Sequence, residues 1–96
     1  MRRRYLVCYD ITDKKRLRRV HKRMKGYGDP LQYSVFRCDL SAAEKTLMLE
    51  AVLGQMKQDV DRLMVVDLGR ADSKSLAETE YFGPRPDPPA DGAIII

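Results

Sequence analysis

The pattern of apolar and polar residues predicts a strand followed by a helix at the start of the chain. Tyr5–Tyr9 is short, aromatic and β-branched, which favours a strand, and it ends at the polar Asp10. Alternation places the odd-numbered residues of this strand on one face of a sheet and its even-numbered residues, with Asp10, on the other. Apolar residues at helical spacing within Leu17–Tyr27 then predict a helix, capped by Thr12 or Asp13.

The same reading predicts two more strands and a second helix. Asp29-Pro30 indicates a turn, and Gln32–Cys38 alternates as a second strand. The segment Ser41-Ala-Ala-Glu44 has the spacing of a capping box, so it opens a helix that continues to the polar stretch Lys57–Asp61. Leu63–Leu68 is apolar enough to be a central third strand. The expected core face of the second helix consists of Leu47, Met48, Ala51, Val52 and Met56.

The end of the chain has a different character. After a polar stretch, Tyr81-Phe82 indicates the start of an edge-like strand. Gly83–Gly92 contains four of the five prolines and excludes a regular element. The final Ala93–Ile96 is strongly β-prone, so it is either a frayed tail or a strand added to a sheet edge, for example on a second copy. We therefore divide the chain into a folded domain, residues 1–82, and a Pro-rich tail, residues 83–96.

Strands and helices in this order predict an α+β protein with a ferredoxin-like (βαββαβ) fold. In that arrangement both helices cover one face of an antiparallel sheet. The pattern offers no clear strand for one of the four places, and only the region after Cys38 or the weak Tyr81 strand is available to fill it.

Length and composition exclude several classes of protein. The 96 residues form one domain, with a core small enough to make self-association a reasonable expectation. Two cysteines and one histidine exclude a disulfide-rich secreted scaffold and a self-contained zinc site. No apolar run approaches the ~20 residues that span a bilayer. We expect a reduced, soluble, cytoplasmic protein with no membrane association.

Charge is distributed very unevenly along the chain. Residues 1–39 contain twelve basic and four acidic residues, whereas residues 40–96 contain six and ten. Eight of the twelve residues from Lys14 to Lys25 are basic. Such a segment attracts polyanions, and nucleic acid is the commonest one, although a solvated face without a partner has the same composition. The cations predicted to contact nucleic acid are Arg16, Arg18, Arg19, Lys22 and Arg23.

Asp10 is the main candidate for chemistry. It ends a strand, where side chains are held rigidly, just before the most basic segment, so its carboxylate would be able to hold Mg²⁺ beside a phosphodiester. One carboxylate is a poor magnesium site, which a two-fold dimer would complete with a second copy. The alternative is that Asp10 caps a turn or the helix start. His21 and the cysteines Cys8 and Cys38 are read as packed residues, since no nucleophile or metal motif surrounds them.

Three separated motifs resemble the CRISPR-associated protein 2 family, the small subunit of the spacer-acquisition machinery in bacterial and archaeal antiviral defence. They are the apolar strand and basic helix within Tyr5–Val20, the Lys25-Gly-Tyr-Gly28 segment, and Leu31-Gln-Tyr-Ser-Val-Phe36. The resemblance covers roughly residues 4–68. It implies a ferredoxin-like homodimer with facing sheets, in which a C-terminal strand often crosses to the other protomer.

The resemblance also implies a site and two functions. Paired strand-end aspartates, here Asp10, would be catalytic and hold Mg²⁺. Tyr9, Arg16, Arg19 and Phe36 match site-adjacent positions, and Arg37 is counted with them. Some family members are metal-dependent nucleases on single-stranded RNA or double-stranded DNA. The other role is structural: the dimer bridges two dimers of the integrase (CRISPR-associated protein 1) and supports a protospacer DNA duplex. A stand-alone toxin-type ribonuclease on the same fold is the alternative.

Overall fold

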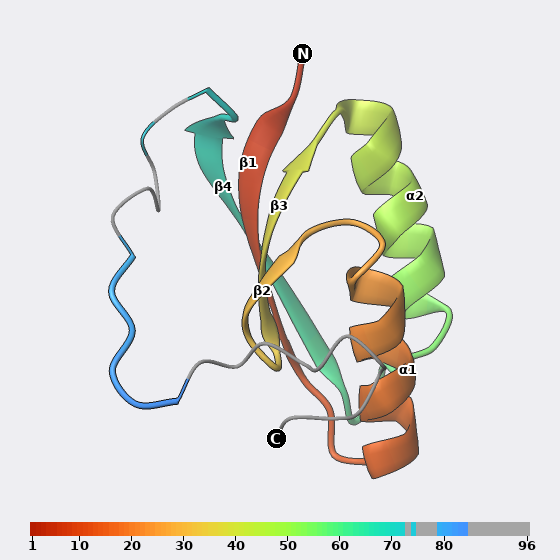
Figure 1. Ribbon diagram of the computed structural model, residues 1–96. Helices are drawn as coiled ribbons and strands as arrows, with labels where there is room; N and C mark the ends of the chain where they lie inside the picture. Colours follow the sequence, from red (N-terminus) through yellow and green to blue (C-terminus); the bar gives the residue numbers. More distant parts are fainter. Residues whose placement is uncertain (73, 75–78, 85–96) are drawn as a thin grey trace.

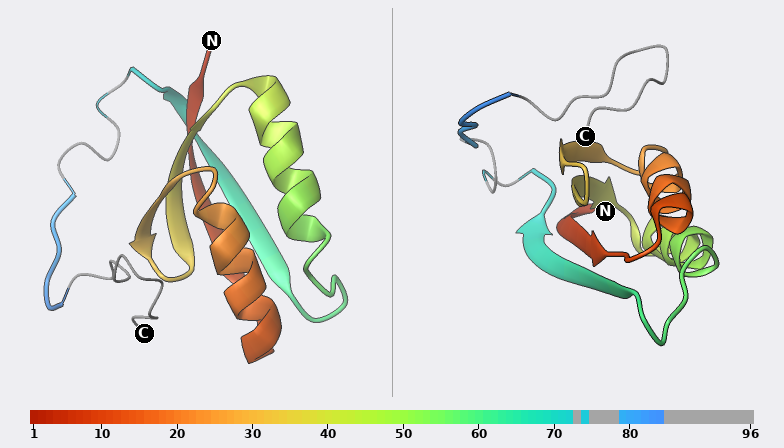
Figure 2. Two further views of the ribbon diagram at one scale, coloured as in Figure 1. Left: turned by 45° about the vertical axis from the view of Figure 1, so that its right-hand side comes forward. Right: turned by 90° about the horizontal axis from the view of Figure 1, so that it is seen from below.

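The chain folds into a four-stranded sheet with two helices on one of its faces. The computed structural model describes residues 1–72, 74 and 79–84. Every neighbouring pair of strands is antiparallel, and the strand order is β2-β3-β1-β4. Figures 1 and 2 show α1 and α2 side by side on one face, while no helix or strand of the described residues covers the other face. This arrangement confirms the predicted α+β, ferredoxin-like class. The elements in chain order are β1 (Arg3–Asp10), α1 (Lys14–Met24), β2 (Asp29–Gln32), β3 (Val35–Leu40), α2 (Ala42–Leu53) and β4 (Arg62–Arg70).

The core lies between the sheet and the two helices, and alternation along the strands builds it. Tyr5, Val7 and Tyr9 of β1 are buried while the residues between them are not, as the sequence predicts. The helices contribute fully buried residues that recur at helical spacing. The other main core residues are Val20 and Met24 of α1, Phe36, Cys38 and Leu40 of β3, and Met48 and Val52 of α2.

Helix boundaries follow the predicted capping chemistry. Asp13 is the N-cap of α1, and its carboxylate accepts a hydrogen bond from the amide of Arg16 at 2.9 Å. Ser41 and Glu44 form the predicted capping box at the start of α2. One predicted core residue of α2 is wrong, because Leu47 is 55% exposed on the outer side of the helix. Leu49 packs against the core instead.

The strand that the sequence pattern lacked is the first half of a hairpin. The single strand predicted over Gln32–Cys38 is wrong: Gln32 ends β2, Tyr33-Ser34 forms the turn, and β3 begins at Val35. The turn predicted at Asp29-Pro30 is also wrong, since both residues lie in β2. Proline has no backbone N–H for a ladder, but β2 is an edge strand, where a missing donor is tolerated. The two halves of this hairpin are both needed to complete the βαββαβ order.

The last strand is longer than predicted and lies at an edge. β4 pairs only with β1, so it is not the central strand that its apolar composition indicated. Gly69 does not end it but lies within it at φ 100°, near an irregularity in the β1–β4 register. Leu63 and Val65 pack on the helix-covered face, whereas Met64 lies on the open face and is 55% exposed. An edge strand that is apolar on both faces would be explained by a second layer over the open face.

The open face of the sheet carries an apolar centre along β1 and β4, with charged residues toward the ends of these strands and Arg37 of β3 opposite Leu6. Cross-strand pairs on this face join Leu6 with Val66 and Cys8 with Met64. Arg4 and Asp39 lie opposite each other near one end, and Asp10 lies opposite Arg62 at the other. We call this surface the open sheet face.

The last described residues do not extend the sheet. Tyr81 and Phe82, where the sequence indicated an edge strand, lie outside any strand and are exposed. The predicted terminal strand, Ala93–Ile96, lies outside the described residues, and so does most of the Pro-rich tail. Within the described part of the chain, neither helix has the length and hydropathy needed to cross a bilayer.

Candidate metal site and nucleic-acid interface

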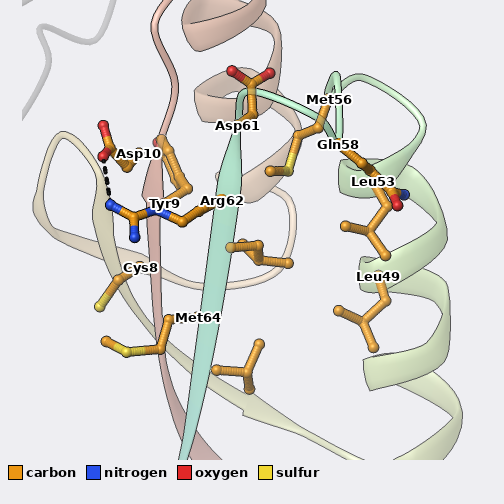
Figure 3. A pocket seen from close by; sticks show the side chains of 12 residues that line it. Cys8, Tyr9, Asp10, Leu49, Leu53, Met56, Gln58, Asp61, Arg62 and Met64 are labelled. Carbon is orange, nitrogen blue, oxygen red and sulfur yellow. Dashed lines mark hydrogen bonds and ion pairs between the residues drawn. The ribbon is translucent and has the colours of Figure 1, made fainter.

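Asp10 is the last residue of β1 and lies on the open sheet face. Its partner in the β1–β4 ladder is Arg62, the first residue of β4. The two side chains meet in an ion pair in which Nη2 of Arg62 lies 3.4 Å from Oδ2 of Asp10 (Figure 3). Both side chains are largely exposed, 73% for Asp10 and 84% for Arg62. The carboxylate is therefore held on a rigid strand end yet remains open to solvent and ligands.

Asp10 is held in place by contacts that its neighbour Tyr9 makes with the turn of the β2–β3 hairpin. The amide of Tyr9 donates to the carbonyl oxygen of Ser34 at 3.1 Å, and the Tyr9 hydroxyl donates to the carbonyl oxygen of Tyr33 at 2.5 Å. Burial raises the pKa of the Tyr9 hydroxyl well above its ordinary range, so this hydroxyl stays a neutral donor. The end of β1 and the tip of the β2–β3 hairpin are thus built as one unit.

His21 supports the same turn from α1. Its ring stacks on Tyr33 with ring centroids 3.9 Å apart, and Nδ1 lies 2.9 Å from the carbonyl oxygen of Tyr33. Because a carbonyl oxygen only accepts hydrogen bonds, Nδ1 must carry the proton. Nε2 is then a bare, buried acceptor without a hydrogen-bond partner, and burial lowers the pKa of His21. His21 is a neutral packing residue, which agrees with its interpretation from the sequence.

Two of the predicted site-adjacent residues lie on the opposite side of the sheet from Asp10. Tyr9 and Phe36 are buried beneath the helices, with ring centroids 6.3 Å apart. They shape the site through the backbone rather than by touching a ligand on the open sheet face. Arg37 does lie on the open sheet face, but it pairs across the ladder with Leu6, well away from Asp10 along the strands.

Asp61 is a site residue that sequence reasoning missed. Its side chain is fully buried and accepts hydrogen bonds from Nε of Arg16 at 2.8 Å and Nη2 of Arg16 at 3.2 Å. It also accepts from the amides of Lys57 at 2.9 Å and Thr12 at 3.4 Å. The Arg16 bonds hold the pKa of Asp61 down at about 2, so the carboxylate is ionised at neutral pH. This network ties the loop after β1 to the loop before β4.

Asp61 and Arg62 are consecutive in the chain but serve opposite sides of the sheet. Asp61 bonds to Arg16 on the helix-covered side. Arg62 reaches Asp10 on the open sheet face (Figure 3). The only sequence signal for Asp61 was its place in the polar stretch before a strand, and nothing local distinguished it from its neighbour Asp59. A groove of about 910 Å³ follows this end of β4, between the strand and Leu49, Leu53 and Met56.

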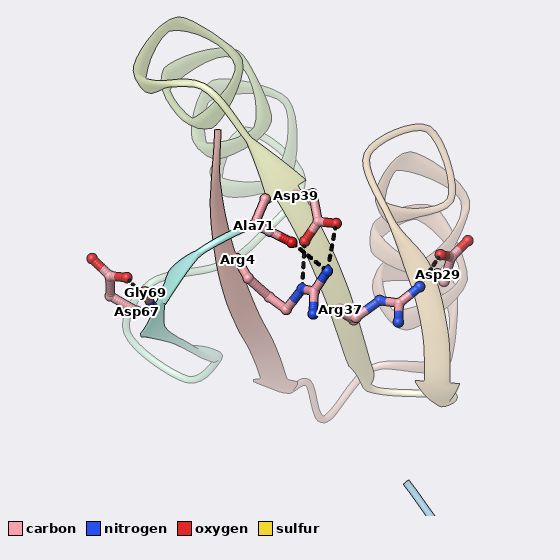
Figure 4. A network of polar contacts seen from close by, with 7 residues as sticks. All are labelled: Arg4, Asp29, Arg37, Asp39, Asp67, Gly69 and Ala71. Carbon is pink, nitrogen blue, oxygen red and sulfur yellow. Dashed lines mark hydrogen bonds and ion pairs between the residues drawn. The ribbon is translucent and has the colours of Figure 1, made fainter. Parts of the chain in front are cut away.

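Most basic residues on or near the sheet are neutralised by acidic partners. Arg4 donates to Asp39 at 2.9 Å and to the carbonyl oxygen of Ala71 at 2.7 Å, and Arg37 lies 3.0 Å from Asp29 (Figure 4). These arginines were part of the N-terminal basic excess, yet their charge is matched locally. Further ion pairs of this kind are Arg2 with Glu44 and Arg3 with Asp67.

The exposed cations of α1 differ from the arginines on the sheet. The described residues include no salt bridge to any of them. Arg16 is the exception on the helix, since Asp61 holds its guanidinium and leaves it 22% exposed. We call this group the α1 cations; it contains four of the five predicted nucleic-acid contacts and three further lysines. Its members are Lys14, Lys15, Arg18, Arg19, Lys22, Arg23 and Lys25 at the helix end.

The single carboxylate of Asp10 suits a hard cation only if a second molecule contributes further oxygen ligands. The described residues contain no group of three or more His, Cys, Asp or Glu side chains able to hold a metal ion. Asp61 is close in sequence to Arg62 but its oxygens are already engaged by Arg16 and two amides. At this end of the sheet a single copy therefore offers one exposed carboxylate, that of Asp10. Mg²⁺ binds to one or two carboxylates together with water and phosphate oxygens. Asp10 therefore supplies one of the two carboxylates of such a site.

The structure is that of a small ferredoxin-like α+β protein, with an exposed aspartate at a strand end and exposed cations along α1. The family model described as CRISPR associated protein Cas2 matches residues 1–75. The chain belongs to this family, which confirms the resemblance found in the sequence.

Relatives and solved structures agree with that assignment. A protein of Rhodospirillum rubrum named CRISPR-associated endoribonuclease Cas2 1 is 41% identical over 73 residues, 76% of this chain and 72% of its own length. The CRISPR-associated endoribonuclease Cas2 of Geobacter sulfurreducens is 33% identical over 96% of each chain. The crystal structure of Streptococcus pyogenes Cas2 matches with a TM-score of 0.70 at 28% identity, covering 83% of this chain and 99% of that one.

Proposed function

We propose that this chain is the nucleic-acid-binding subunit of a CRISPR adaptation complex. As a homodimer it would hold a protospacer DNA duplex and bridge two dimers of the integrase, CRISPR-associated protein 1. The observation that carries the proposal is the pairing pattern of the basic residues. The sheet arginines are neutralised within the fold, whereas the α1 cations are exposed and lack ion pairs in the described residues. Free cations gain most from displacing the counterions of a phosphate backbone.

The open sheet face supports the proposed homodimer. It presents Leu6, Cys8, Val66 and Met64 in two cross-strand pairs, with charged pairs toward its ends. Two copies that meet through this face would bury an apolar centre and bring their Asp10 residues to a common region. That arrangement would supply the second carboxylate that one copy lacks.

We also propose an Mg²⁺-dependent endonuclease activity at Asp10, on RNA or DNA. The relatives named endoribonucleases support phosphodiester hydrolysis as the reaction. A bound divalent cation would polarise the phosphodiester and lower the pKa of a bound water. The protein's own contribution is to hold Asp10 on a fixed strand end, through the Tyr9 contacts, while leaving its oxygens accessible. The α1 cations, on the other side of the sheet, would hold a bound duplex by its phosphates without reading bases.

Duplex binding tests the first part of the proposal. A fluorescein-labelled DNA duplex titrated with the full chain at several salt concentrations should show a log–log slope near −7 if the dimer contacts about 8 phosphates. Arg19→Glu with Arg23→Glu should weaken binding at least tenfold and flatten the slope. Arg2→Gln with Arg37→Gln removes two charges that are already paired, so it should change binding far less. A slope near zero, or equal losses in both double variants, would contradict binding through α1.

Cleavage assays separate the enzyme from the scaffold. Asp10 lies on the opposite face of the sheet from the helices, so Asp10→Asn should abolish Mg²⁺-dependent cleavage and leave duplex binding in metal-free buffer unchanged. Wild-type protein that never cleaves RNA or DNA with Mg²⁺ or Mn²⁺ would end the nuclease proposal but not the scaffold. A neighbouring antitoxin gene, in place of repeat arrays and integrase genes, would instead favour the stand-alone toxin-type ribonuclease.

A further inference from the structure

Arg62 stands out because it is the cation that the structure places against the candidate metal ligand. Its Cα is paired with that of Asp10 at the end of the β1–β4 ladder, and Nη2 lies 3.4 Å from Oδ2 of the carboxylate. The resemblance to the family did not point to this position, and the motifs quoted for it end before β4. The contact is nevertheless the one ion pair that Asp10 makes within the described residues.

The two ends of this contact differ in how firmly they are held. The backbone at Arg62 is fixed, because Asp61 is buried and bonded to Arg16 and to two amides. The guanidinium at the far end of the side chain is 84% exposed. An exposed ion pair of this kind is weak and is screened by salt. A stronger competitor for either partner would therefore open the pair without disturbing the fold.

A metal-bound nucleic acid supplies a competitor for both partners. A divalent cation competes for the carboxylate of Asp10, and a phosphate group offers the guanidinium a bidentate acceptor of higher charge density. While Arg62 stays on Asp10, its positive charge opposes the approach of a cation. Once released, the same side chain is anchored directly across the β1–β4 ladder from the metal ligand, within reach of a phosphate beside it.

We propose that Arg62 is a substrate-positioning residue: its guanidinium occupies Asp10 in the absence of metal and transfers to a phosphate oxygen of the nucleic acid when a divalent cation binds Asp10. The inference rests on the proposed metal role of Asp10. It predicts opposite effects of one substitution, since removing Arg62 should favour metal binding and weaken nucleic-acid binding at the site. A residue that only stabilises the fold would shift both in the same direction or neither.

Arg70 provides a matched control on the same strand. It lies at the other end of β4, is exposed, and forms an ion pair with Asp72 at 3.2 Å. Arg70→Ala therefore removes the same side chain and a comparable surface ion pair from β4, far from Asp10. Arg62→Lys keeps the charge but not the bidentate geometry, so it separates the two parts of the proposal.

The first measurement is Mn²⁺ binding to the full chain without nucleic acid, followed by electron paramagnetic resonance. Arg62→Ala should tighten Mn²⁺ binding by about 3- to 10-fold, because a positive charge a few ångströms from the ligand is removed. Arg62→Lys and Arg70→Ala should stay close to wild type, and Asp10→Asn should weaken binding. Thermal melting in the absence of metal should be unchanged in all the arginine variants, because both pairs lie at the surface.

The second measurement is binding of a labelled single-stranded RNA and a DNA duplex in the presence of Mn²⁺ by the chain that retains Asp10, read at times too short for cleavage to be detected. Arg62→Ala should weaken binding of the preferred nucleic acid 2- to 5-fold and reduce the salt slope by about 1 per lost contact. Arg62→Lys should give a smaller loss, and Arg70→Ala none.

The outcomes distinguish this inference from the function on which it rests. Unchanged Mn²⁺ affinity in Arg62→Ala, while Asp10→Asn loses affinity, would overturn the role of Arg62 and leave the metal site standing. Weaker Mn²⁺ binding in Arg62→Ala would also overturn it, since the pair would then be helping the ligand rather than competing with the metal. Unchanged Mn²⁺ affinity in Asp10→Asn would remove the metal site itself, and this inference with it.

Discussion

Both faces of the sheet carry apolar residues from the same strands, but the fold of one protomer fully buries only those on the helix-covered face. On the helix-covered face, Tyr5, Val7 and Tyr9 are buried against both helices. On the open face, their neighbours Leu6 and Cys8 lie beside Val66 and Met64 with only partial burial. Alternation in β1 therefore does not separate apolar from polar residues, as it does in a sheet that faces water.

This difference shows which features the fold of one protomer accounts for. The covered face forms a complete core, and its buried polar groups other than Nε2 of His21 are satisfied, as in the bonds of Asp61 and the Tyr33 carbonyl oxygen. The open face combines exposed apolar side chains with Asp10, whose ion pair is weak. We read the covered face as the part that holds the protomer together and the open face as the part that acts on other molecules.

The largest effect should follow a truncation on the covered face. Phe36 is fully buried and contacts both Tyr9 and His21 through its ring. Phe36→Ala should cost about 3–5 kcal/mol of unfolding free energy, because it removes buried surface and leaves a cavity. Urea denaturation followed by circular dichroism measures this loss. A loss below 1 kcal/mol, together with lost cleavage, would instead place Phe36 in the site, as the family resemblance suggested.

Asp61 should give the next largest effect. Asp61→Asn removes the charge that satisfies Arg16 beneath the sheet, and we expect a fall in melting temperature of more than 10 °C. Asp59→Asn changes an exposed carboxylate in the same loop and should leave the melting temperature within about 2 °C. Equal falls in both variants would mean that the loop's net charge, rather than the buried pair, carries the stability.

Acid titration tests the same group without a mutation. The pKa of Asp61 lies below its ordinary value, at about 2, so its contribution to stability is complete above about pH 4. That contribution should be lost as the pH falls from about 4 toward 2. The difference in unfolding free energy between wild type and Asp61→Asn should therefore shrink over this range. A difference that stays constant down to pH 2 would contradict the assigned pKa.

A charge on the open face should affect assembly rather than folding. Met64→Glu introduces a carboxylate at the apolar centre of this face, and we expect the dissociation constant of the proposed homodimer to rise at least 100-fold. Leu47→Glu is the matched control, because Leu47 is equally exposed, at 55%, but lies on α2. Analytical ultracentrifugation measures both. Dissociation caused only by Leu47→Glu would place the interface on the helices.

The smallest effect should come from a sheet arginine whose charge is already paired. Arg37→Gln breaks one ion pair with an exposed Asp29, so we expect less than about 1 kcal/mol of lost stability. Duplex affinity should fall less than twofold, measured by fluorescence anisotropy at 100 mM salt. Arg19→Gln, which removes one of the α1 cations, is the comparison, and an equal loss of affinity in the two variants would show that pairing does not remove a cation from the binding surface.

Local patterns in the sequence were enough for most of the fold. The alternation in Tyr5–Tyr9, the cap at Asp13 and the capping box at Ser41 all act within a few residues, and the structure confirms each. The turn at Tyr33-Ser34 was missed because it lacks the glycine or asparagine typical of tight hairpins. It is stabilised by tertiary contacts from Tyr9 and His21, which no local pattern reveals.

The sequence predicted several of the residues that belong to the candidate site, but not how their side chains are paired. Composition showed the basic excess, but it did not show which arginines have acidic partners, because those partners lie far away in the sequence. Arg3 and Asp67, for example, are 64 residues apart. Asp61 and Arg62 were overlooked for the same reason, since their importance depends on where β4 begins in relation to β1.

Because Asp61 and Arg62 are adjacent at the start of β4, their opposite charges help to fix the register of β4 against β1. If β4 slid by one residue along β1, Asp61 would move to the open side and Arg62 would be driven under the helices. Arg16 would then lose its counter-charge and a second guanidinium would enter the interior beside it. A mispaired sheet would thus contain two unmatched cations in its core, and folding intermediates in that state should revert instead of persisting.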